Sequence, residues 1–150
     1  MTDVLKIAQI AKFAAEDALK LSTDIKNKAL NSVAEILENN KNAILEANKI
    51  DIENAKSTDI SLSMLNRLKL DDNKLRDMIS GVRDIAALED PVNKLIWSKD
   101  IAEGITLKKI SCPIGVIGVI FEARPDVVSQ ISSLAIKSSN AVILKGGSEA

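Results

Sequence analysis

The sequence predicts an α/β fold, in which a helical amino-terminal region is followed by the first βαβ unit of a Rossmann-like parallel sheet. Apolar residues recur at helical spacing over residues 1–90. After Pro91 the period changes, and two short, almost continuously apolar runs flank one amphipathic segment. The chain has 150 residues, of which 46% are hydrophobic, so it is long enough to bury a sizeable core.

The helical region, residues 1–90, is expected to contain helices with recognisable ends. Ser22 or Thr23 can cap the second helix, because both side chains accept a hydrogen bond from the first turn. Asp71 is the expected cap of the last helix, and Pro91 prevents that helix from continuing. The expected helices cover residues 4–18, 24–37, 41–56 and 72–85.

A β-hairpin is expected over residues 91–112. Two strands at residues 92–98 and 105–110 are joined by a turn-prone segment, residues 99–104. We expect this hairpin to be a unit of its own between the helices and the sheet.

The start of a parallel sheet is expected over residues 113–150. The apolar run at residues 114–121 is typical of a strand buried on both faces. A helical pattern at residues 127–137 and a second buried strand at residues 141–144 complete a βαβ unit with parallel strands. The glycines that follow are typical of the start of a helix, so we expect the chain to be the first part of a longer sheet.

Charge and composition exclude several classes of function. The 20 basic and 21 acidic residues give a net charge of −1, so neither nucleic acid nor an anionic membrane is indicated as a partner. The chain has no histidine, which removes imidazole catalysis and histidine metal ligands, and no metal site is expected. Without a signal peptide or a membrane-spanning run, we expect a cytoplasmic protein that binds a small-molecule substrate.

The single cysteine, Cys112, cannot form an intramolecular disulfide, which is consistent with a reducing compartment. It precedes Pro113 at the start of a strand, and no adjacent residue can act as its base. We therefore interpret Cys112 as a structural or incidental thiol and not as a catalytic nucleophile.

Ligands of open α/β sheets bind at the carboxyl ends of the strands, which here are followed by residues 122–125 and 145–149. Arg124 lies at the first of these corners, where its guanidinium could bind a carboxylate or a phosphate through two parallel hydrogen bonds. Alternatively, it is a surface arginine paired with Glu122 or Asp126. The residues alone leave both interpretations open.

The second corner begins at Lys145, at the position that meets the adenine ribose in dinucleotide-binding sheets. A cation there accommodates a 2′-phosphate and so favours NADP, and Gly147 would let backbone amides approach a ligand, with Ser148 capping the next helix. A solvated lysine in an ordinary loop is the alternative. Neither a G-x-G-x-x-G motif nor a P-loop is present.

Two stretches carry a likeness to a known family. PIGVIGVIFEARP at residues 113–125 and SNAVILKGGSE at residues 139–149 resemble the γ-glutamyl phosphate reductase family, a branch of the aldehyde dehydrogenase superfamily. The likeness runs through the whole chain and includes MLNRL at residues 64–68 and DPV at residues 90–92. It implies an aldehyde-dehydrogenase-like fold of which this chain is only the amino-terminal portion.

The resemblance also implies an activity. The family reduces L-glutamyl 5-phosphate with NADPH to glutamate 5-semialdehyde and phosphate, the second step of proline biosynthesis, through a cysteine thioester. That cysteine is expected beyond Ala150, so the chain alone is expected to be inactive. The cofactor is expected to be NADP(H). The hairpin resembles the arm through which superfamily members contact one another, which implies a homo-oligomer for the full-length enzyme.

The resemblance also implies roles for individual residues. Arg124 is expected to contact the acyl phosphate or the developing oxyanion. Lys145 is expected to contact the adenine ribose, and Glu149 corresponds to the ribose-binding glutamate of the superfamily, although this loop is one residue longer. Asp126 stands where many relatives have asparagine, and we expect it to cap the following helix rather than to pair with Arg124.

Two other functions are compatible with the sequence. The first is another acyl-phosphate or aldehyde dehydrogenase, which would oxidise simple aldehydes without phosphate. The second is a non-catalytic fragment that acts as a helical interaction module and binds no NADPH.

Overall fold

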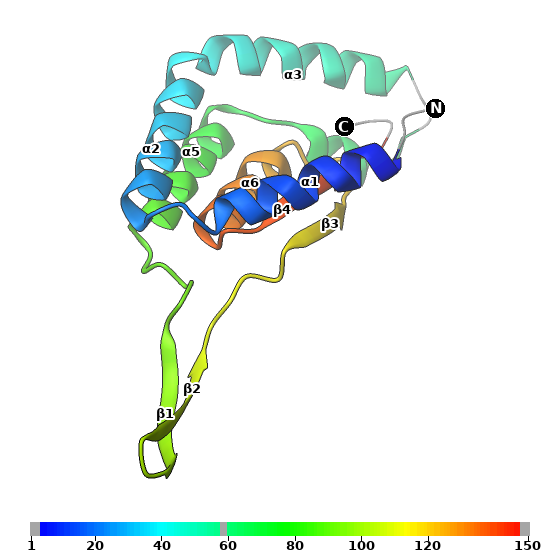
Figure 1. Ribbon diagram of the computed structural model, residues 1–150. Coiled ribbons are helices and arrows are strands. Elements are labelled where there is room, and N and C mark those ends of the chain that lie inside the picture. The colour runs from blue at the N-terminus through cyan, green and yellow to red at the C-terminus, as the bar shows by residue number, and fades with distance from the viewer. Residues whose placement is uncertain (1–3, 58–59, 148–150) are drawn as a thin grey trace.

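The computed structural model describes residues 4–57 and 60–147 and has a helical body from which one β-hairpin projects (Figure 1). No helix among these residues is long and apolar enough to cross a membrane. In chain order the elements are α1 (Val4–Ala18), α2 (Thr23–Asn39), α3 (Lys41–Lys56), α4 (Leu62–Leu68), α5 (Asp72–Ala87), β1 (Leu95–Ala102), β2 (Ile105–Ile110), β3 (Val116–Ile120), α6 (Asp126–Lys137) and β4 (Ala141–Lys145).

The α/β fold class is confirmed, and two predicted caps form. The Ser22 hydroxyl accepts a hydrogen bond from the Ile25 amide at 3.3 Å, and the Asp71 carboxylate accepts from two amides of the first turn of α5. Helix α4 was not predicted. It has only seven residues, too few for a helical period to be visible in the sequence, and it begins at a cap by Ser61.

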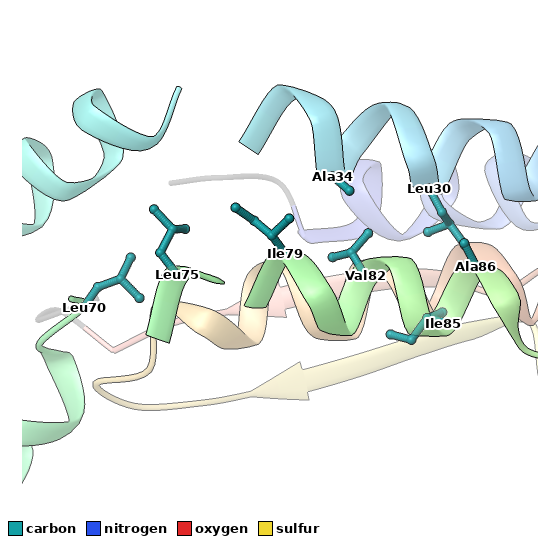
Figure 2. Packing of buried hydrophobic residues seen from close by; sticks show 8 residues of the cluster. All are labelled: Leu30, Ala34, Leu70, Leu75, Ile79, Val82, Ile85 and Ala86. Carbon is teal, nitrogen blue, oxygen red and sulfur yellow. The ribbon is translucent and has the colours of Figure 1, made fainter. Parts of the chain in front are cut away.

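The main core lies between α2 and α5, which pack side by side. Leu30 and Ala34 of α2 meet Ile79, Val82 and Ala86 of α5, and all of them are almost completely excluded from solvent (Figure 2). Since burying a large aliphatic side chain contributes roughly 1.5–3 kcal/mol, this contact provides a large share of the stability of the body.

A buried polar network joins this core to the sheet. The Lys26 side chain is almost fully buried, forms an ion pair with Asp90 and donates to the Ser139 hydroxyl at 3.2 Å. The Lys137 ammonium donates to the Asn27 side chain at 2.7 Å. The two lysines therefore connect α2 to the end of α6 and to the segment that leads into the hairpin, and each buried charge has partners.

The antiparallel hairpin β1–β2 forms as expected, but β1 continues to Ala102, so the predicted turn at residues 99–104 is wrong. The reversal needs only Glu103 and Gly104, because Gly104 adopts a φ of 73°, and Asp100 then pairs with Thr106 across the strands. Every residue of both strands is exposed, and the hairpin extends away from the body (Figure 1).

Strands β3 and β4 pair in parallel, with Val116 opposite Ala141 and Ile120 opposite Lys145, and α6 connects them. The prediction that the first strand is buried on both faces is wrong. The exposed fraction is 84% for Ile120, and exposed and half-buried residues alternate along β3. Helices α1 and α6 both contact β4, but they leave part of β3 uncovered.

Candidate functional site

The carboxyl ends of β3 and β4 meet at one edge of the sheet. Beyond the paired strands, the Phe121 amide donates to the Lys145 carbonyl at 3.1 Å, and the Gly147 amide donates to the Phe121 carbonyl at 3.0 Å. The two loops that the sequence singled out therefore start side by side. This is the edge at which open α/β sheets bind ligands.

Arg124 points out of the first loop as a half-exposed side chain, with 53% of its surface accessible. One guanidinium nitrogen donates to the Asp126 carboxylate at 2.8 Å. This hydrogen bond and the negative charge of Asp126 raise the pKa of Arg124 above its usual value, so the guanidinium stays charged. Its remaining donors are available to an anion, since a guanidinium carries five N–H groups.

The expected role of Asp126 as a helix cap is wrong. Pro125 occupies the cap position of α6, and Asp126 is the first helical residue, with its side chain directed to Arg124. A carboxylate in the first helical turn still benefits from the helix dipole, and a charge-assisted bond to a guanidinium is stronger than a bond to an amide. The pair forms for this reason, and Asp126 holds Arg124 at the corner.

Lys145 ends β4, and its exposed ammonium donates to the adjacent Gly146 carbonyl at 2.5 Å. Within the described ranges no carboxylate lies in ion-pair contact with it. A cation in this position can pair with an anionic group of a ligand. The Gly147 amide donates to the Phe121 carbonyl and is therefore engaged within the chain. Ser148 and Glu149 lie outside the described residues.

A cleft of about 580 Å³ opens beside Arg124, between α5 and the amino-terminal end of α6. Its apolar wall includes Met78, Val82 and Leu134. Its charged lining residues are Arg67, Lys69, Lys74, Asp77, Arg124 and Asp126. The size and the mixture of apolar wall and few charges are typical of small-molecule sites.

Sequence reasoning did not identify the charged residues that α4 and α5 contribute to this cleft. Lys74 has a structural role, because its ammonium donates to the carbonyls of Asn66 and Lys69 at 3.1 and 2.6 Å and so closes the end of α4. Arg67 lies in the MLNRL stretch, which was noted only as a likeness. That stretch was the one available signal.

Cys112 is exposed, carries a free thiol and lies in the connection between β2 and β3. It is not among the residues that line the cleft.

Comparison with known proteins gives a consistent result. No family model matches the chain. The γ-glutamyl phosphate reductase of Brachyspira hyodysenteriae is 57% identical over 150 residues, and that of Trichodesmium erythraeum is 47% identical over 147 residues. The crystal structure of the Saccharomyces cerevisiae γ-glutamyl phosphate reductase superposes with a TM-score of 0.96 over 99% of the chain, at 41% identity.

The chain belongs to the γ-glutamyl phosphate reductase family. The corresponding crystal structure from Thermotoga maritima agrees, with a TM-score of 0.91 and 37% identity over 97% of the chain. The chain spans only about a third of these γ-glutamyl phosphate reductases, 35% of the Brachyspira protein and 38% of the yeast structure, and corresponds to their amino-terminal portion.

Proposed function

We propose that the complete enzyme carrying this chain reduces L-glutamyl 5-phosphate to glutamate 5-semialdehyde and phosphate with NADPH, as a step of proline biosynthesis in the cytoplasm. The names of the relatives support a γ-glutamyl phosphate reductase. The observation that carries the proposal is the position of Arg124, a charged and half-exposed side chain at the carboxyl end of β3 that lines the cleft.

The chemistry assigned to this portion is electrostatic. Arg124 donates to the phosphate or to the oxygen on which negative charge develops, and Asp126 fixes its orientation. A cysteine in the remaining portion attacks the acyl carbon, phosphate leaves, and the resulting thioester accepts a hydride and releases the aldehyde and the thiol. Bound NADPH supplies that hydride. Lys145 binds its ribose phosphate.

The proposal is tested in the reverse direction, by following phosphate-dependent reduction of NADP with glutamate 5-semialdehyde. We expect activity from the complete enzyme and none from the 150-residue chain. Arg124→Gln should lower kcat by about 10²- to 10³-fold, because it removes a donor to the developing charge. Arg76→Gln is the control, since Arg76 is exposed and does not line the cleft.

The outcomes separate this function from its alternatives. Turnover by the isolated chain would contradict the proposal that the catalytic cysteine lies in the remaining portion of the enzyme. Oxidation of simple aldehydes without phosphate would favour another aldehyde dehydrogenase. Lys145→Ala should weaken the preference for NADP over NAD, and an unchanged preference would remove Lys145 from the cofactor site.

We also propose that the segment 91–112 is an arm through which full-length copies form a homo-oligomer. Its support is the exposure of every residue of β1 and β2, including large apolar side chains such as Trp97 and Ile101. The measurement is the oligomeric mass of the complete enzyme with and without Ile101→Asp. An unchanged mass would contradict the proposal.

A further inference from the structure

Three charged side chains in the cleft are not engaged within the chain. They are Arg67, Lys69 and Asp77, and none of them forms a hydrogen bond or an ion pair through its side chain with another residue of the described ranges. The neighbouring charges are engaged: Lys74 donates to two carbonyls, and Arg124 pairs with Asp126. The cleft therefore offers two cations and one anion to a ligand, and of the two cations only Arg67 has the planar fork of donors that matches a carboxylate.

Arg67 and Asp77 are carried by elements that the core holds in place. Arg67 lies in the last turn of α4. The buried Asn48 side chain fixes the segment that follows, because it donates to the Leu68 carbonyl at 2.9 Å and accepts from the Leu70 amide at 2.7 Å. Asp77 lies on α5, whose opposite face is part of the main core. Such support keeps a binding geometry constant.

The ligand chemistry that matches this lining is an α-amino acid end group, with a carboxylate and an ammonium on one carbon. A guanidinium binds a carboxylate through two parallel hydrogen bonds, and an aspartate accepts from an ammonium. Arg124 lines the same cleft and is the group already assigned to the phosphoryl end. A substrate with an anionic phosphoryl group at one end and an amino acid group at the other would use all three.

We propose that Arg67 binds the α-carboxylate and Asp77 the α-ammonium of the glutamyl substrate, and that these two residues determine specificity for an amino acid. This inference rests on the proposed function. It assigns no chemical step to either residue: both bind the unreactive end and so orient the acyl carbon relative to Arg124.

The test pairs each residue with a substrate that lacks the matching group. In the complete enzyme, Arg67→Gln should lower kcat/KM for glutamate 5-semialdehyde by roughly 10- to 100-fold, mainly through KM, because one charge-assisted interaction is lost. The same variant should leave kcat/KM for 4-aminobutanal unchanged, since this aldehyde has no carboxylate. Asp77→Asn should behave in the complementary way, with 5-oxopentanoate, which has no ammonium, as the insensitive substrate.

Matched controls and a second variant keep the outcome decisive. Arg76→Gln and Asp84→Asn remove the same charges from exposed positions of α5 that do not line the cleft, and they should change no substrate preference. Arg67→Lys retains the charge without the fork of donors and should lower kcat/KM less than Arg67→Gln. Circular dichroism of each variant establishes that its fold is intact.

Each result has one meaning. If the parent enzyme shows no phosphate-dependent activity, the proposed function itself fails. If the parent is active but Arg67→Gln and Asp77→Asn lower kcat/KM equally for substrates with and without the matching group, the inference is overturned while the function stands. Selective loss, residue by residue, supports it.

Discussion

The helix pair α2–α5 and the hairpin β1–β2 use apolar residues in opposite ways. Leu30 and Leu75 are 0% exposed and lie in one cluster, whereas Trp97 and Ile101 of β1 are 44% and 57% exposed. The first region buries these side chains within the chain, and the second leaves them exposed. Apolar composition alone does not distinguish a core from an interface.

The hairpin depends on support at its base, because an isolated two-stranded ribbon is marginally stable in water. There, the Ser111 hydroxyl donates to the Pro91 carbonyl at 2.6 Å and accepts from the Lys94 amide at 2.9 Å. The adjacent Asp90 is held by Lys26 and by the Thr23 hydroxyl, which donates at 2.8 Å. The helical body thus fixes the direction of a strand pair that has no core.

The largest expected effect on stability comes from truncating a side chain of the helix pair, compared with the same truncation in the hairpin. Leu75→Ala should lower the free energy of unfolding by about 3–5 kcal/mol, because it leaves a cavity in the cluster. Leu107→Ala in the hairpin is the matched control and should change it by less than about 1 kcal/mol, since Leu107 is 48% exposed. Urea unfolding measures both, and equal losses would contradict the contrast.

Breaking the link between the two regions should have the next largest effect. Lys26→Met removes the partner of Asp90, whose side chain is only 16% exposed, and should cost about 2–3 kcal/mol. Lys20→Met removes a cation from the exposed Lys20–Asp17 pair and should cause no measurable change. A small effect of Lys26→Met would show that the network does not hold the hairpin base.

The same link should give the stability a dependence on pH. Burial acts to raise the pKa of Asp90, but hydrogen bonds from Lys26, the Val92 amide and Thr23 outweigh it and lower the pKa below the ordinary value of an aspartate. A carboxyl whose pKa is depressed in the folded state contributes stability above the unfolded pKa, and this is lost as the pH falls through the folded value.

Urea unfolding between pH 5 and pH 2 measures this loss. We expect Asp90→Asn to be less stable than the parent at pH 5 and to show a smaller decline toward acid pH, because it has no proton to gain at this site. An equal slope in both proteins would exclude Asp90 as a source of the acid sensitivity.

The smallest effect is spectroscopic. Trp97 is the single tryptophan of the chain and lies in β1 with 44% of its surface exposed. Its fluorescence should be that of a hydrated indole in the isolated chain and should shift to shorter wavelength in the complete enzyme, if the hairpin is covered there. Equal emission maxima would contradict coverage at Trp97.

The sequence predicts those parts of the fold that depend on local interactions. The caps at Ser22 and Asp71 and the parallel pairing of β3 with β4 follow from residue type and period. The prediction that β3 is buried on both faces was wrong, because the coverage of a strand depends on which elements pack on it and not on its own residues. Helix α4 lacks the length that a period requires.

The site was predictable only where topology alone defines it. The corner at Arg124 follows from the rule that ligands bind at the carboxyl ends of parallel strands. From the sequence, the Asp126 side chain could cap the helix or pair with Arg124, and in the structure it pairs with Arg124. Arg67 and Asp77 line one cleft because tertiary packing brings α4 and α5 to it, and such packing leaves no local pattern in the sequence.

The hydrogen bond from the Gly147 amide to the Phe121 carbonyl affects which mutations the site tolerates. Neighbouring parallel strands lie about 4.8 Å apart, so the backbone sets the spacing at which the loops that carry Arg124 and Lys145 leave the sheet. Side-chain replacements within β3 or β4 preserve that spacing. Inserting or deleting a single residue in either strand would shift the register and displace Arg124 along the strand direction relative to Lys145.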